Sequence, residues 1–191
     1  MGEIRFEKHG SNQIWIYSNA FLWFSCKRLH RHIIRDKYGV KREGEGECLS
    51  KTNWMGDCGK MTQPDHKFGK IFEKLYFDEF KKEVFRKMKH NIELSAVWYQ
   101  VYGPNSSSYH GWHKHLTNNR HDPRKFSSVL LLELPDEKLT TKFVDEQSGI
   151  EFTPKVKERE TLVFGSNILH CSPPNNTNKR KTVISFNWNI V

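Results

Sequence analysis

The sequence lacks the long apolar segments that mark membrane and secreted proteins. None of its 191 residues lies in an apolar run of 18, so we expect no membrane-spanning helix and no membrane partner. The segment from Met1 to Phe6 also lacks the apolar centre of a signal peptide. We therefore expect a cytoplasmic protein.

Cysteine is equally sparse. The four cysteines are irregularly spaced and form no Cys-x-x-Cys pair, which argues against a disulfide framework and favours reduced thiols. Cys48 and Cys58 are separated by nine residues, which is not the spacing of a zinc knuckle.

Apolar residues make up only 36% of the chain, but aromatic residues, at 13%, can compensate in buried area. The length fits a single domain spanning residues 1–191. The net charge of +9 permits a weak affinity for acidic partners. The basic residues are dispersed, however, and many lie on expected helices, where a solvated helix face explains them better than a nucleic-acid interface does.

The first half of the chain shows helical periodicity. Residues 14–17 are typical of a short strand, and Ser18 or Asn19 then caps a helix that runs to about Tyr38. An apolar stripe predicts a long amphipathic helix over 64–90. Residues 41–64, between the helices, are rich in glycine and charge, which predicts a loop or a weak pair of strands and makes them a candidate lid.

The second half has the period of strands. Six short segments are rich in β-branched and aromatic residues, and polar turns such as 135–137 and 173–176 separate them: 93–102, 126–134, 140–144, 150–153, 161–164 and 182–190. Helices followed by many short strands predict an α+β, mainly β fold, a double-stranded β-helix (jelly roll) with supporting N-terminal helices. Residues 1–92 would form the helical support and loop region, and residues 93–191 the jelly-roll core.

Three histidines and a basic pair carry the chemistry. His113 and His115 are two residues apart, so on an extended segment their side chains share a face. His170 lies 55 residues beyond His115 and can reach that face only if the sheet folds back over itself. Arg180 follows ten residues after His170 and forms a second i, i+2 pair with Thr182. This series predicts a metal site with a carboxylate clamp beside it.

The series resembles the iron(II)/2-oxoglutarate-dependent oxygenases, in particular the prolyl-4-hydroxylase-like branch and its small phage and bacterial members. That family typically carries His-x-Asp/Glu, a distal histidine, and an Arg-x-Ser/Thr about ten residues later. The resemblance covers roughly residues 93–191 and depends on order and spacing. It extends to the stretch Trp98-Tyr99-Gln100-Val101-Tyr102-Gly103 before the first ligand, to 127–134, and to 160–164 before the distal histidine.

The resemblance implies a C–H hydroxylase whose metal site comprises His113, His115 and His170. Fe(II) would bind the 2-oxo acid end of 2-oxoglutarate, and O₂ would take the remaining position. Arg180 would hold the far carboxylate, with Thr182 and either Tyr102 or Tyr99 contacting the cosubstrate. The primary substrate would be a peptide or protein side chain, or a nucleotide-like molecule. A phage-encoded protein would act in the host cytoplasm.

One position departs from the family pattern, because His115 stands where most members have Asp or Glu. Asp122 is an alternative carboxylate ligand. Because His110 and His121 lie in the same stretch, the sequence leaves open which of its histidines are the first ligands. Two other functions also remain open. One is a cupin-like three-histidine dioxygenase that does not use 2-oxoglutarate, and the other is a basic nucleic-acid-binding domain with a structural metal. The oligomeric state is not predicted.

Overall fold

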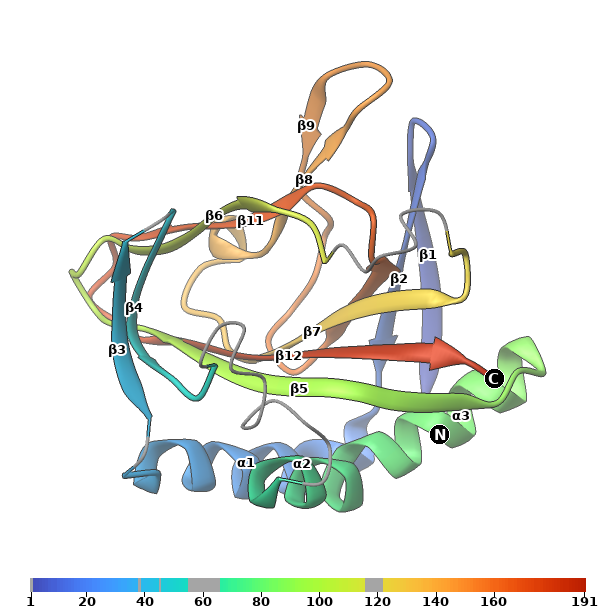
Figure 1. Ribbon diagram of the computed structural model, residues 1–191, viewed down its shortest axis with the longest axis horizontal. Coiled ribbons are helices and arrows are strands. Elements are labelled where there is room, and N and C mark those ends of the chain that lie inside the picture. The colour runs from blue at the N-terminus through green and yellow to red at the C-terminus, as the bar shows by residue number, and fades with distance from the viewer. Residues whose placement is uncertain (1, 38, 45, 55–65, 116–121) are drawn as a thin grey trace.

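A computed structural model describes residues 2–37, 39–44, 46–54, 66–115 and 122–191 (Figure 1). Its helical elements are η1 (Ala20–Leu22), α1 (Trp23–Arg35), α2 (Lys67–Phe72), the π-helical turn η3 (Glu73–Phe77), α3 (Asp78–Met88) and η4 (Glu137–Leu139). Its strands are β1 (Glu3–His9), β2 (Asn12–Ser18), β3 (Val40–Gly44), β4 (Glu47–Thr52), β5 (Ile92–Tyr102), β6 (Ser108–His113), β7 (Lys125–Glu133), β8 (Lys142–Asp145), β9 (Ile150–Phe152), β10 (Thr161–Gly165), β11 (His170–Asn175) and β12 (Lys181–Ile190).

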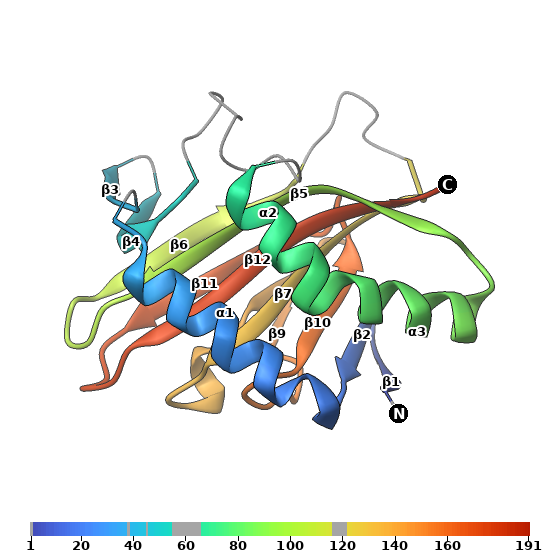
Figure 2. The ribbon, with the colours of Figure 1, turned by 90° about the horizontal axis from the view of Figure 1, so that it is seen from below.

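The strands form one antiparallel sheet that bends into two facing layers. The strand order is β1-β2-β10-β7-β12-β5-β4-β6-β11-β8-β9, with β3 paired to β4. In Figure 1 the strands β7, β12 and β5 form the lower layer, and β6, β11 and β8 lie above them. The helices cover the outer face of the lower layer, as Figure 2 shows from below. The predicted double-stranded β-helix with supporting N-terminal helices is confirmed.

Alternation along β12 divides the interior into two cores. Ile184, Phe186 and Trp188 are fully buried against the helices, where they join the first apolar cluster. Val183, from the intervening set, belongs to a second cluster between the two layers. Because successive strand side chains point to opposite faces, every residue of β12 is assigned to the helix side or to the interior of the sandwich.

The helices follow the sequence pattern closely. Asn19 caps η1, which leads directly into α1, and its side chain accepts a hydrogen bond from the backbone N–H of Phe21 at 3.0 Å. The helix then ends at Arg35, three residues before the expected end. The second predicted helix is present as the uninterrupted run α2–η3–α3. Its expected start at Pro64 lies outside the described residues, as do Cys58 and part of the candidate lid. No described helix is long and apolar enough to cross a membrane.

The strand predictions hold for all six segments of the second half, within a few residues at each end. The prediction of a turn over 173–176 was wrong, since β11 continues to Asn175. Bulges in its pairing with β6, on both sides of Ser172, interrupt the ladder there. Proline is tolerated where the ladder is interrupted, because its missing N–H costs nothing at such a position. β3 and β4 form the weak strand pair that was the alternative to a loop here.

Candidate metal centre

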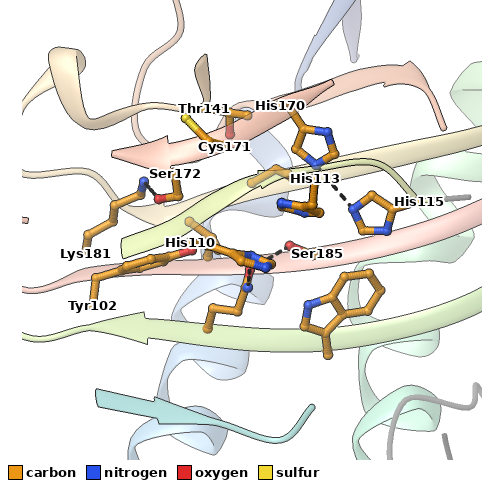
Figure 3. A pocket seen from close by; sticks show the side chains of 14 residues that line it. Tyr102, His110, His113, His115, Thr141, His170, Cys171, Ser172, Lys181 and Ser185 are labelled. Atoms are coloured by element: carbon orange, nitrogen blue, oxygen red, sulfur yellow. Dashed lines mark hydrogen bonds between the residues drawn. The ribbon is translucent and has the colours of Figure 1, made fainter. Parts of the chain in front are cut away.

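Three histidine side chains converge between the two layers of the sheet. His113 ends β6 and His170 begins β11, and the two residues face each other in the antiparallel pairing of these strands. His115 follows two residues after His113. One ring nitrogen of each histidine lies within 4.8 Å of the others, and the Nε2 atoms of His115 and His170 are 3.2 Å apart. Figure 3 shows the three rings turned toward one another.

Two of the rings are oriented by backbone carbonyl groups. His113 Nδ1 donates to the carbonyl oxygen of Gly111 at 2.7 Å, and His170 Nδ1 donates to that of Ile168 at 2.9 Å. A carbonyl oxygen can only accept, so the ring proton lies on Nδ1 when these imidazoles are neutral. The Nε2 lone pairs of His113 and His170 therefore remain free, which is the arrangement that a metal ligand needs.

Burial keeps the imidazoles neutral. Burial, together with the neighbouring His113, lowers the pKa of His115 to about 3, and burial and the neighbouring histidines lower that of His170 well below its ordinary value. Burial also lowers the pKa of His113. A neutral imidazole is the form that binds a metal ion.

The donor set fits a transition metal with open coordination positions. Three imidazoles suit iron, zinc or copper. Structural zinc sites usually have four closed ligands, often including cysteine. Among the described residues, however, the group contains three histidines only. Cys171 is not one of its members, and burial raises the pKa of its thiol to about 11, which disfavours the thiolate that a metal would bind.

The alternative carboxylate is not part of this group. Asp122 accepts hydrogen bonds from the backbone and side chain of Arg124. The group of His113, His115 and His170 therefore does not include Asp122. His121 lies outside the described residues.

A small hollow of about 20 Å³ opens beside the histidines. Strands β5, β6, β7, β11 and β12 supply most of its lining, which consists of Trp98, Gln100, Tyr102, His110, His113, His115, Val129, Thr141, His170, Cys171, Ser172, Lys181, Val183 and Ser185 (Figure 3). Tyr102 was expected at this site and lines it. His110 also lines it, with its ring stacked on that of His113 at a centroid distance of 3.9 Å.

Lys181 brings a cation into the hollow. Its side chain is 1% exposed. The ammonium group donates to the backbone carbonyl of Leu139 and, at 2.6 Å, to Ser172 Oγ. It also lies 4.7 Å from the centre of the Tyr102 ring. Burial lowers the pKa of Lys181 to about 7. Within the described part of the chain no salt bridge pairs with this amine, which at neutral pH is charged in only part of the molecules and has no anionic partner in the hollow.

Arg180, the residue before β12, and Thr182 both point to the face opposite Lys181. Arg180 pairs with Glu133 through Nε and Nη2, both at 2.8 Å, and Nη2 is also 3.1 Å from His30 Nε2 of α1. The Thr182 hydroxyl donates to the same carboxylate. Although burial alone would raise the pKa of Glu133, these hydrogen bonds lower it. The structure does not bring either residue into the hollow.

Tyr99 is also turned away from the histidines. It packs in the core beneath the helices, and its hydroxyl donates to Asp36. Sequence reasoning thus missed Lys181 and placed its two neighbours in the site. Alternation along β12 separates Lys181 from these two neighbours, but only the helices packed on Ile184, Phe186 and Trp188 identify the even-numbered side as the outer one. Lys181 is on the other side.

Comparison with known proteins gives a fold but no close relative. No protein-family model matches the sequence, and no curated protein is similar to it. Among solved structures, a prolyl hydroxylase from Trichoplax adhaerens, in complex with a hypoxia-inducible factor peptide, shares 13% identity. That match has a TM-score of 0.61 and covers 93% of this chain and 83% of the other.

Two further structures agree. A Pseudomonas putida prolyl-4-hydroxylase is 13% identical, with a TM-score of 0.56 over 91% of this chain and 88% of the other. SnoN, a non-heme alpha-ketoglutarate-dependent epimerase from nogalamycin biosynthesis, is 10% identical, with a TM-score of 0.63 over 90% of this chain and 74% of the other. This chain has the 2-oxoglutarate oxygenase fold. The resemblance predicted from sequence is confirmed at that level, whereas the comparisons do not support a phage origin.

Within the 2-oxoglutarate oxygenase fold, then, the described residues place three neutral histidines and one buried lysine around a single hollow. Such an arrangement can hold a metal ion and, beside it, an anion.

Proposed function

We propose that this protein is an Fe(II)- and 2-oxoglutarate-dependent oxygenase that hydroxylates a C–H bond of its substrate. The observation that carries the proposal is the pairing of the histidine group with Lys181 in one hollow. A buried ammonium group is costly unless it is paired. A dicarboxylate that reaches from the histidines to Lys181 would supply the missing counter-charge.

Each residue has a defined task in this proposal. His113, His115 and His170 would hold the iron through ring nitrogens. Lys181 binds the far carboxylate in place of Arg180, with the Tyr102 ring beside it. When bound, iron and 2-oxoglutarate together supply the oxidising power for the C–H bond. Trp98, Val129 and Val183 form an apolar part of the lining, which would help to orient the substrate and exclude water.

The His115 position gives the site a higher charge than the usual two-histidine, one-carboxylate set. Three neutral imidazoles leave the bound metal one unit more positive than a set that includes a carboxylate. This charge favours an anionic bidentate cosubstrate such as 2-oxoglutarate. A three-histidine dioxygenase that uses no cosubstrate shares the metal face, but it gives no reason for Lys181.

We further propose a peptide or protein side chain as the primary substrate. Two of the similar structures are prolyl hydroxylases, and one of them is in complex with a peptide. The net charge of +9 would favour acidic segments through long-range attraction.

The proposal can be tested without knowing the substrate. Protein loaded anaerobically with Fe(II) should, on addition of O₂, convert 2-oxoglutarate to succinate in an uncoupled reaction. His170→Ala should abolish both iron binding and succinate formation. His110→Ala, which changes a ring stacked on the group but outside the ligand set, should retain iron. Iron binding without 2-oxoglutarate consumption would instead favour the cosubstrate-independent dioxygenase.

A further inference from the structure

The third histidine of the group has a partner unlike those of the other two. Backbone carbonyls orient His113 and His170, whereas His115 Nδ1 lies 3.4 Å from the side-chain amide of Asn187. Asn187 belongs to β12 and lies on the same side of that strand as Lys181, which faces the interior of the sandwich. An amide can donate through Nδ2 or accept through Oδ1, so it can hold either neutral form of the ring.

In the orientation that the structure shows, the amide donates. Asn187 Nδ2 is the atom that faces His115 Nδ1, so the ring proton would lie on Nε2. From there it can be donated to His170 Nε2, 3.2 Å away. This set of hydrogen bonds is self-consistent, but it uses the two lone pairs that a metal would need. It also leaves Asn187 Oδ1 buried and without a hydrogen-bond donor.

Reversing the amide frees the two lone pairs and gives the buried oxygen a donor, while Nδ2 takes the position in which Oδ1 had no partner. A half-turn about the last side-chain bond exchanges Oδ1 and Nδ2 with almost no change of shape. Oδ1 then accepts from His115 Nδ1–H, and the buried oxygen gains its donor. The proton has left Nε2, so the lone pairs of all three histidines point to one place. The three rings are then held alike, each by an oxygen on Nδ1.

We propose that Asn187 is a positioning residue that selects the metal-binding tautomer of His115. Its amide donates to the ring in the metal-free protein and reverses to accept from it when metal binds. The proton moves from Nε2 to Nδ1 of the same ring, so the net charge is unchanged. This inference rests on the proposed metal site and adds the means by which a histidine serves in a position where the related enzymes usually have a carboxylate.

Substitution separates the two roles of the amide. Asn187→Leu keeps the approximate volume but offers neither donor nor acceptor. It should weaken Zn²⁺ binding, measured by competition with a chromogenic chelator, by about 10- to 100-fold, the usual effect of losing a hydrogen-bond partner of a ligand. Asn187→Asp offers only acceptors and should bind Zn²⁺ at least as tightly as wild type. Asn189→Leu, two residues along the same strand, is the matched control and should change little.

Nitrogen NMR of the histidine rings supplies a readout that a structural defect would not reproduce. In the metal-free wild type His115 should carry its proton on Nε2, and in the Zn²⁺-loaded protein on Nδ1. Asn187→Asp should place the proton on Nδ1 even without metal. In a His115→Asp background there is no ring to orient, so adding Asn187→Leu should have no further effect on Zn²⁺ affinity.

The outcomes distinguish this inference from the function on which it rests. If wild type binds no Zn²⁺, the metal site itself is wrong, and the role of Asn187 falls with it. If wild type binds Zn²⁺ but Asn187→Leu binds it equally well, the metal site stands and Asn187 does not position His115. An Nδ1 proton on His115 in the metal-free wild type would likewise overturn the proposed reversal. Should Asn187→Leu fail to fold, Asn187→Asp and the NMR measurement still decide.

Discussion

At the scale of single residues, the decisive contrast is between Lys181 and Arg180. Lys181 faces the hollow and lacks a carboxylate partner among the described residues, while Arg180 is already paired with Glu133. Losing one partner of a buried charge pair costs roughly 2–5 kcal/mol. Lys181→Met should therefore weaken 2-oxoglutarate binding by more than tenfold, and Arg180→Met should leave it within about twofold.

The measurement is a titration of 2-oxoglutarate into anaerobic, iron-loaded protein, followed by the metal-to-ligand absorption band. Both variants remove one positive charge from adjacent residues, so a general electrostatic effect would weaken binding equally in the two. If Arg180→Met instead bound 2-oxoglutarate much more weakly than Lys181→Met, Arg180 would be the residue that holds the far carboxylate, as the sequence spacing suggested.

The pKa of Lys181 gives the same interaction a pH dependence. Since burial lowers that pKa to about 7, the free protein loses the charged ammonium group as the pH rises above 7. A bound carboxylate favours the charged form and raises the pKa, so binding takes up a proton. The dissociation constant for 2-oxoglutarate should therefore increase between pH 7 and 9, a range in which the histidines are neutral throughout. A constant affinity over this range would exclude Lys181 as the partner. Lys181→Arg, which stays charged, should flatten the profile.

At the scale of elements, the sequence predicted the strands better than it predicted their faces. The alternation of apolar and polar residues located β5, β7 and β12 to within one residue. It also placed Arg180 and Thr182 correctly on one face of a strand. Alternation alone does not say which face looks inward when both are largely buried, as they are in β12. Only the helices packed on Phe186 and Trp188 settle that choice.

Two strands had signals that pointed elsewhere. β1 is rich in charge, with Glu3, Arg5, Glu7 and Lys8, because it lies at the edge of the sheet, where charged side chains remain in water. β11 contains Pro173 and Pro174, which are typical of a turn, and its irregular pairing with β6 accommodates them. Composition predicts a strand from the environment that most strands have. β1 and β11 lie in other environments, an exposed edge and an interrupted ladder, so their composition did not indicate strands.

At the scale of the whole molecule, the metal group exists only because the sheet folds back on itself. His113 and His170 are 57 residues apart in the chain and become direct neighbours through the pairing of β6 with β11. Spacing in the sequence could suggest that the three histidines meet. It could not show that Asn187 reaches His115 from β12, 72 residues away in the chain, because that contact depends on how the two layers face each other.

This closure predicts that metal binding stabilises the entire fold. An ion held by His113 of β6, His170 of β11 and His115, two residues after β6, binds the native state only, because the unfolded chain does not bring these ligands together. At a free metal concentration 100 times the dissociation constant, the free energy of unfolding increases by about 2.7 kcal/mol. For a domain of this size, each kcal/mol raises the melting temperature by roughly 2–4 °C.

Calorimetry with Zn²⁺ at that ratio should therefore show a rise in melting temperature of about 5–11 °C that a chelator reverses. His170→Ala should show no such rise and His110→Ala should retain it. An equal rise in His170→Ala would mean that the stabilising ion binds elsewhere in the protein.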